Sequence, residues 1–181
     1  MSINKTSIPV KEMVIIALFT AVLCAVAPFS ITIGPIPLSF ATLVIYLAAG
    51  TLGWKNGTIS VALYVLLGAI GLPVFSNFGG GFQKIAGPTG GFIIGYIPLA
   101  LATGLAVDFF NKNRLIYIIG MVIGTVLLYT CGVIWFMFQT KASLITALMA
   151  CVVPFLIGDT IKIIISCIIT PQLRAALQKT H

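Results

Sequence analysis

The residues whose types and spacing best suit chemistry are Asp159 and Lys162. They lie within 144–170, a run that is otherwise made almost wholly of apolar or small residues. An ionisable side chain at bilayer depth costs roughly 2.5–3.5 kcal/mol on insertion scales, so such residues usually mark substrate or ion sites. A separation of three positions places both side chains on one face of a helix, about 5–6 Å apart. We therefore predict a polar ligand site or an ion path; a pair that only joins helices is the alternative.

The rest of the chain offers little for catalysis. Its only histidine is His181, and its four cysteines lie in apolar runs without CxxC spacing. These residues provide neither a histidine-based metal site nor a catalytic triad, and the sequence has no GxxxxGK[ST] loop to bind ATP. We therefore expect no cofactor and no enzymatic activity. Any energy for transport has to come from a partner or an ion gradient.

The composition is that of a polytopic membrane protein. Of the 181 residues, 60% are hydrophobic and 7% are charged, and the mean hydropathy is +1.18. Soluble domains carry about 25% charged residues, and a soluble protein this apolar would expose patches that aggregate. The net charge of +7 comes from basic residues dispersed between apolar runs, which is typical of cytoplasmic loops and not of a nucleic-acid surface. We expect one membrane domain over residues 1–181, embedded in a lipid bilayer, with no nucleic-acid partner.

Six apolar runs predict an all-α bundle of six transmembrane helices. A span needs about 20 residues, and the runs are 13–33, 38–54, 58–72, 91–110, 115–138 and 144–170. If the amino terminus lies inside, the basic residues on the inner side are Lys5, Lys11, Lys55, Lys112, Arg114, Arg174 and Lys179, and those on the outer side are Lys84 and Lys141. Because cytoplasmic loops are enriched in lysine and arginine, we expect both termini in the cytoplasm and the 73–90 connection outside.

The 73–90 connection is the longest between the expected spans and is rich in glycine and phenylalanine. A loop of this length without its own secondary structure is usually functional. Asn77, Gln83 and Thr89 offer hydrogen bonds, and glycines such as Gly91 let backbone approach a ligand closely. Asp159 lies about 22 Å along a helix from Leu144, so either the loop dips inward or the helix projects outward if the two are to meet. A plain extracellular loop is the alternative.

Ala17, Ala21 and Ala25 form a stripe of small residues in the first run, at a spacing of four. Such a stripe lets another helix approach closely, which is a main route to helix association in lipid. The stripe therefore predicts a partner interface. Chance, or packing within the bundle, is the alternative because alanine is common in membrane helices.

Taken together, these residues resemble the BioY family, the biotin-binding substrate-capture (S) components of energy-coupling-factor (ECF) transporters. The resemblance covers nearly the whole chain. It rests on the alanine stripe, on GAIGLPVF at 68–75, on GPTGGFIIGY at 87–96, and on Gly158-Asp159 with Lys162 three positions later.

The resemblance implies a multi-pass protein of a prokaryotic plasma membrane that captures biotin from outside with high affinity. It also implies a membrane-embedded coupling subunit, which meets the small-residue first helix at Ala17, Ala21 and Ala25. Two cytoplasmic ATPase subunits then drive release by toppling the S component.

Biotin suits the residues of the expected site. It has a ureido group with two N–H donors and one carbonyl, an apolar bicyclic body and a carboxylate tail. We expect Asp159 to accept from a ureido N–H, and Lys162 to donate either to the ureido carbonyl or to the carboxylate. Phe75, Phe78 and Tyr96 are expected to cover the apolar rings, because ligand pockets are mostly apolar with few placed polar groups. The runner-up function is an autonomous secondary carrier for a small carboxylate-bearing solute, coupled to protons through Asp159.

Overall fold

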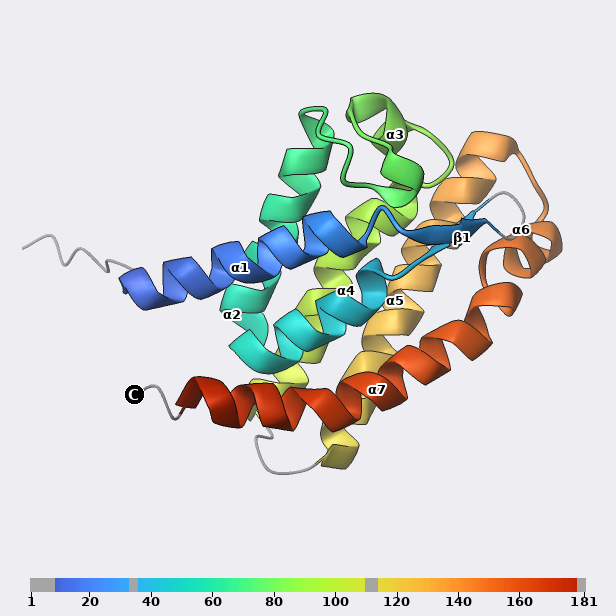
Figure 1. The fold of residues 1–181 in the computed structure, drawn as a ribbon. Coiled ribbons are helices and arrows are strands. Elements are labelled where there is room, and N and C mark those ends of the chain that lie inside the picture. The colour runs from blue at the N-terminus through green and yellow to red at the C-terminus, as the bar shows by residue number, and fades with distance from the viewer. Residues whose placement is uncertain (1–8, 33–35, 110–113, 179–181) are drawn as a thin grey trace, which may run out of the picture.

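The computed structural model describes residues 9–32, 36–109 and 114–178 and is a bundle of helices with one short hairpin (Figure 1). The elements in chain order are α1 (Val10–Val26), β1 (Ser30–Thr32), β2 (Pro37–Ser39), α2 (Ala41–Ala69), η1 (Ser76–Phe78), α3 (Phe82–Ala86), α4 (Gly90–Phe109), α5 (Arg114–Thr140), α6 (Leu144–Cys151) and α7 (Val153–Gln178). Four residues named above lie outside the described residues: Lys5, Lys112, Lys179 and His181.

The helices have the length and the surface of membrane spans. Among the described residues, three helical stretches are long and apolar enough to cross a bilayer, namely Gly90–Phe109, Arg114–Thr140 and Leu144–Leu177. On α5, the large apolar side chains of Ile123, Val126 and Ile134 point out of the bundle and are exposed. Lipid is the solvent that such a surface requires, because in water it would drive association.

Helix α2 covers the two spans expected at 38–54 and 58–72 as two helical arms joined at a bend. The polar residues 54–57 are helical, and the chain reverses direction at Gly53 alone, with φ 79° and ψ −178°. Only glycine adopts this conformation without strain. The Asp108 carboxylate accepts from the Trp54 N–H at 2.8 Å, so it caps the second arm where the backbone leaves its helical partners. The bend is sharp enough that a Cβ on Gly57 would lie 2.6 Å from Ala49 Cα.

The last expected span, 144–170, is divided into α6 and α7. The break falls at Val152, whose φ of −124° and ψ of −57° are not helical. Pro154 is the second residue of α7, a place in the first turn where a missing N–H costs nothing. Helix α7 then continues past the expected end, through Pro171, to Gln178.

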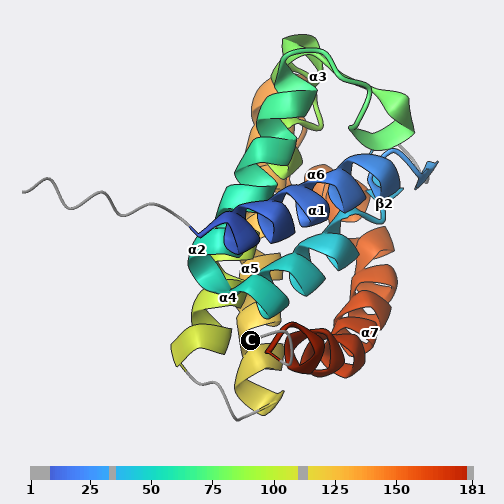
Figure 2. The same cartoon turned by 60° about the vertical axis from the view of Figure 1, so that its left-hand side comes forward.

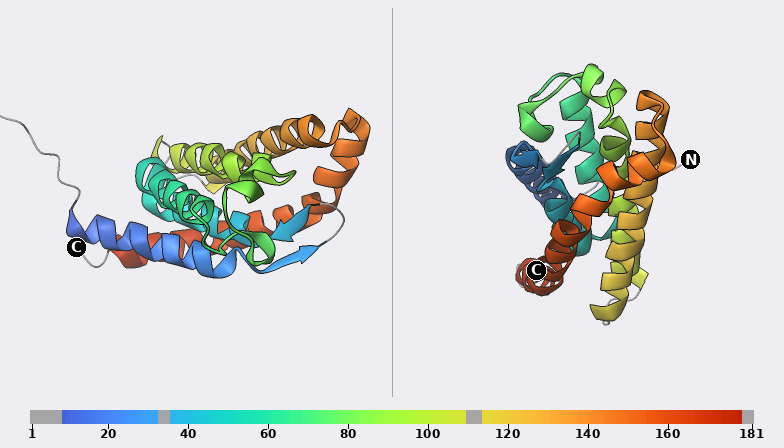
Figure 3. Two further views of the ribbon diagram at one scale, coloured as in Figure 1. Left: turned by 90° about the horizontal axis from the view of Figure 1, so that it is seen from above. Right: turned by 90° about the vertical axis from the view of Figure 1, so that its right-hand side faces the viewer.

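The helices surround α2. Figure 3 shows α1 and α7 along one side and α4 and α5 along the other, and α2 contacts α1, α4 and α7. Figures 1 and 2 agree that α3 lies at one end of the bundle and the carboxyl end of α7 at the other. The core between these layers contains the fully buried side chains of Leu23, Ile45, Tyr46, Leu99 and Met121.

The 73–90 connection has structure of its own, contrary to the expectation of an irregular loop. It contains η1 and the five-residue helix α3. Phe75 anchors it: the ring is 1% exposed and contacts the Tyr64 ring edge-to-face, with centroids 5.6 Å apart. A Cβ on Gly68 would overlap the Phe75 ring, so the absence of a side chain at Gly68 makes room for the anchor.

Candidate functional site

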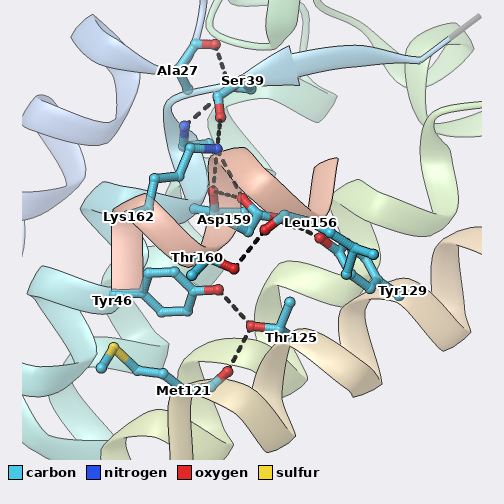
Figure 4. Close-up of polar contacts among 12 residues, drawn as sticks. Ala27, Ser39, Tyr46, Met121, Thr125, Tyr129, Leu156, Asp159, Thr160 and Lys162 are labelled. Atoms are coloured by element: carbon cyan, nitrogen blue, oxygen red, sulfur yellow. Dashed lines mark hydrogen bonds and ion pairs between the residues drawn. The ribbon is translucent and has the colours of Figure 1, made fainter. Parts of the chain in front are cut away.

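Asp159 and Lys162 form an ion pair inside the bundle, as their spacing predicts. The Lys162 Nζ lies 2.9 Å from the Asp159 Oδ1, and the two residues are 5% and 4% exposed (Figure 4). Moving an ion into a protein interior costs several kcal/mol unless further hydrogen bonds satisfy the charges. The arrangement therefore depends on the neighbouring elements that supply those bonds.

The Lys162 ammonium is saturated by three acceptors. Besides Asp159, it donates to the Ser39 carbonyl oxygen at 2.7 Å and to the Thr42 Oγ1 at 2.9 Å. A protonated lysine has three N–H donors, so all three are used. Both additional acceptors come from the junction of β2 and α2. There the Ser39 hydroxyl accepts from the Ala41 N–H and donates to the Ala27 carbonyl oxygen, which holds the junction in place (Figure 4).

The Asp159 carboxylate keeps one place for a further donor. Its Oδ1 accepts from Lys162 and from the Thr42 hydroxyl at 3.2 Å, and its Oδ2 accepts from the Tyr129 hydroxyl at 2.6 Å. A carboxylate has about four lone-pair sites, of which these three bonds occupy three. Asp159 can therefore accept one hydrogen bond from a ligand without losing a partner.

A cavity adjoins this cluster and is lined by segments far apart in the sequence. Its wall includes 36–39 from the hairpin, Phe75 and Ser76 from the connection, Thr89, Tyr96 from α4, and Asp159 and Lys162 from α7. The free volume inside it is about 40 Å³. We infer that the cavity is narrow and that a bicyclic ligand requires the lining side chains to move apart.

The structure brings five of the nine residues expected to bind substrate to this cavity: Phe75, Thr89, Tyr96, Asp159 and Lys162. The connection and Asp159 therefore line one cavity. The connection is pinned there at both ends, by the buried Phe75 ring and by α5, where the Trp135 Nε1–H donates to the Gly87 carbonyl oxygen at 2.9 Å.

Four of the expected substrate-binding residues are placed elsewhere. Phe78 is 61% exposed and is absent from the cavity wall. Asn77 is exposed and, at a φ of 59°, uses its amide to bond Ser30 and Thr32 of β1. Gln83 is exposed on α3 and is absent from the cavity wall. Gly91 is buried against α5, where a Cβ would meet the Trp135 side chain. The polarity of a loop residue does not predict its direction, because local turn geometry sets which way each side chain points.

Several wall residues were not predicted from the sequence: Ser39, Thr42, Tyr64, Lys84 and Tyr129. Thr42 and Tyr129 occur in apolar runs, where a threonine hydroxyl can equally bond the preceding helical turn and a tyrosine can equally be an ordinary core residue. The sequence does indicate that further hydrogen-bond donors are needed, because a buried Asp159 carboxylate requires more donors than one lysine. Which of the chain's many hydroxyls supply them follows only from the packing of α2 and α5 on α7.

The alanine stripe faces away from the bundle. Helix α1 packs against α2 through Ile16, Thr20 and Leu23, which are buried, and the Thr20 hydroxyl donates to the Ser60 carbonyl oxygen at 3.1 Å. Ala17, Ala21 and Ala25 are exposed on the remaining surface of α1. Packing within this bundle therefore does not account for the stripe.

Comparison with known proteins gives one consistent family. The BioY family model matches residues 2–179. The chain is 37% identical over 164 residues to the biotin transporter BioY of Thermotoga maritima, covering 91% of this chain and 96% of that protein. It is 34% identical over 167 residues to a probable biotin transporter BioY of Pyrococcus horikoshii, covering 91% and 96% respectively.

A solved structure shares the whole architecture. The crystal structure of the S-component for biotin from an ECF-type ABC transporter matches this fold with a TM-score of 0.84 and 31% identity, covering 97% of this chain and 95% of its own. The likeness confirms the expected all-α membrane bundle. By sequence and by fold, this chain belongs to the BioY family.

Proposed function

We propose that this chain captures biotin with high affinity as the substrate-binding S component of an ECF-type importer. The observation that carries the proposal is the buried Asp159–Lys162 cluster at the wall of a mostly apolar cavity. Relatives that cover nearly the whole chain are named biotin transporters, which supports biotin as the ligand.

The cluster suits the ureido end of biotin. Asp159 has one lone-pair site free and accepts a ureido N–H there, while Thr42 and Tyr129 keep the carboxylate in a constant orientation. The rings of Phe75 and Tyr96 line the cavity and cover the apolar bicycle. Lys162, whose three donors are all used, acts by holding Asp159 in place and not by donating to the ureido carbonyl or to the carboxylate, the two roles expected for it.

The proposal includes an orientation in the membrane. The α3 end of the bundle, with Lys84, faces outward, and both termini lie in the cytoplasm. The basic residues support this orientation. Arg114 begins α5, Arg174 lies near the end of α7, and Lys55 follows the bend of α2 at Gly53. The carboxyl end of α7 lies at the end of the bundle opposite α3 (Figure 1). Biotin then enters from the α3 side.

The exposed alanine stripe is proposed as the docking surface for the membrane-embedded coupling subunit, which links the S component to two cytoplasmic ATPase subunits. The stripe offers a helix a close approach because no side chain beyond Cβ intervenes at Ala17, Ala21 or Ala25. In this arrangement ATP hydrolysis belongs to the partners.

The alternative of a proton-coupled carrier is less favoured by the geometry. A proton relay at Asp159 has to gain and lose a proton during each cycle. Asp159 accepts hydrogen bonds from Lys162, Thr42 and Tyr129, an arrangement suited to a fixed acceptor for a ligand N–H.

Calorimetric titration of the detergent-purified chain with biotin tests the proposed function. We expect saturable binding of one biotin per chain without ATP or partner subunits. Absence of saturable binding by folded protein contradicts it. The assembly is tested separately, by asking whether ATPase partners co-purify from native membranes in fixed stoichiometry.

A further inference from the structure

The Lys84 ammonium is a cation in the cavity wall that no acid of the chain neutralises. Lys84 lies on α3 and lines the same cavity as the Asp159–Lys162 cluster. The three acidic side chains of the chain have other partners, in the pairs Asp159 with Lys162, Asp108 with Arg174 and Glu12 with Asn56. Within the described part of the chain, the Lys84 ammonium has no hydrogen bond or ion pair.

Lys162, the other cation of the cavity, is poorly suited to an anionic ligand group. Its three N–H donors are taken by Asp159, Ser39 and Thr42, and its charge is balanced by the Asp159 carboxylate. An incoming carboxylate at Lys162 would have to break one of these bonds and would lie beside a like charge. Lys84 has neither obstacle.

Hydrogen bonds hold the backbone that carries Lys84 at the cavity wall. The Lys84 N–H donates to the Gly81 carbonyl oxygen at 3.0 Å, and its own carbonyl oxygen accepts from the Thr89 hydroxyl at 3.4 Å. The next turn is tied to α5, where the Gln139 side chain donates to the Ala86 carbonyl oxygen. The Lys84 stem lies across Gly79, since a Cβ there would be 2.9 Å from Lys84 Cε.

We propose that Lys84 binds the carboxylate at the end of the ligand's acidic tail and determines specificity for ligands with a free carboxylate. The inference rests on the proposed function, because biotin carries a ureido group at one end and a carboxylate at the other. Two different elements supply the polar groups for these two ends, α7 with Asp159 and α3 with Lys84, and both residues line the cavity. A charge-assisted hydrogen bond in a mostly apolar wall discriminates strongly against a neutral analogue.

Titration of the purified chain with biotin and with biotinamide tests this role, because the amide keeps the ureido ring and loses the anionic tail. We expect the wild type to prefer biotin by at least about tenfold. Lys84→Met should abolish the preference by weakening biotin alone, and Lys84→Arg should retain it. Lys162→Met should weaken both ligands by a similar factor, because it disturbs the ureido end.

Two further variants sharpen the result. Lys141→Met removes another basic side chain that follows α5 and lies outside the cavity wall, so it should leave both affinities unchanged. Gly79→Ala keeps the charge but crowds the Lys84 stem, so it should reduce the preference. An intact preference in Lys84→Met, or equal weakening of both ligands, overturns the assignment. Failure of the wild type to bind biotin at all overturns the proposed function instead.

Discussion

The hydroxyl of Tyr129, on α5, donates to the Asp159 Oδ2 on α7 at 2.6 Å. This bond joins two residues that are 30 positions apart in the chain. It leaves Asp159 with a single open lone-pair site. The carboxylate is thereby oriented before any ligand arrives. Pre-organisation of this kind strengthens binding because less ordering remains to be done in the complex.

Removal of the Tyr129 hydroxyl tests that orientation. Tyr129→Phe should lower stability by about 1.5–3 kcal/mol, the range for hydrogen bonds to charged groups, and should weaken biotin binding several-fold. The matched control is Tyr117→Phe, because the Tyr117 hydroxyl is also buried but bonds Tyr46, Ser166 and Thr170 away from the cavity wall. The control should lose stability and keep its affinity, as measured by thermal unfolding and calorimetry. Equal affinities in the two variants would reduce Tyr129 to a structural role.

Disruption of the ion pair should be more severe. Asp159→Asn leaves Lys162 charged without a counter-ion, and breaking a buried pair costs about 3–5 kcal/mol. We expect biotin binding at least about tenfold weaker for Asp159→Asn and for Lys162→Met. Binding is measured by titration of protein whose folding is checked by size-exclusion chromatography. Unchanged affinity in both folded variants, or a loss of folded yield alone, would leave the pair only a structural function.

Bulky residues in the alanine stripe should block docking without touching the ligand site. Ala17→Trp and Ala21→Trp add volume on an exposed face of α1, away from the buried contacts with α2. We expect full biotin binding by the isolated chain and loss of ATP-driven uptake in vesicles that contain the assembled transporter. Val126→Trp, on the exposed face of α5, serves as the control for added bulk and should keep uptake. Normal uptake by both alanine variants would contradict the interface.

The bend of α2 provides a prediction about stability. Gly53→Ala imposes strain of about 1–3 kcal/mol at a glycine-only conformation and also places a Cβ against the Asp108 carboxylate. Gly71→Ala is the control, because Gly71 also has a positive φ, of 115°, but nothing lies within 4 Å of its Cβ position. The unfolding temperature in detergent should fall for both variants and by several degrees more for Gly53→Ala. A similar decrease in the two would mean that Asp108 moves aside at little cost.

Much of the membrane architecture was predictable from the sequence because lipid imposes a simple rule. Backbone polar groups inside a bilayer have to bond one another, so long apolar runs become helices. The same rule marks Asp159 and Lys162 as exceptional. It does not predict where a helix bends: the polar residues 54–57 suggested a turn, while the actual reversal needs only Gly53, supported by Asp108 from α4.

The tertiary structure alone decided which residues share the cavity. Asp159 and Lys162 are three positions apart, so helix geometry placed them together, and a motif in the sequence was enough to find them. Ser39, Thr42, Tyr129 and Lys84 belong to other elements, and their directions depend on how α2, α3 and α5 pack against α7. Asn77 and Gln83 are as polar as these residues and lie outside the wall. Spacing in one helix is a local property that the sequence determines, whereas contact between elements is a property of the whole packed bundle.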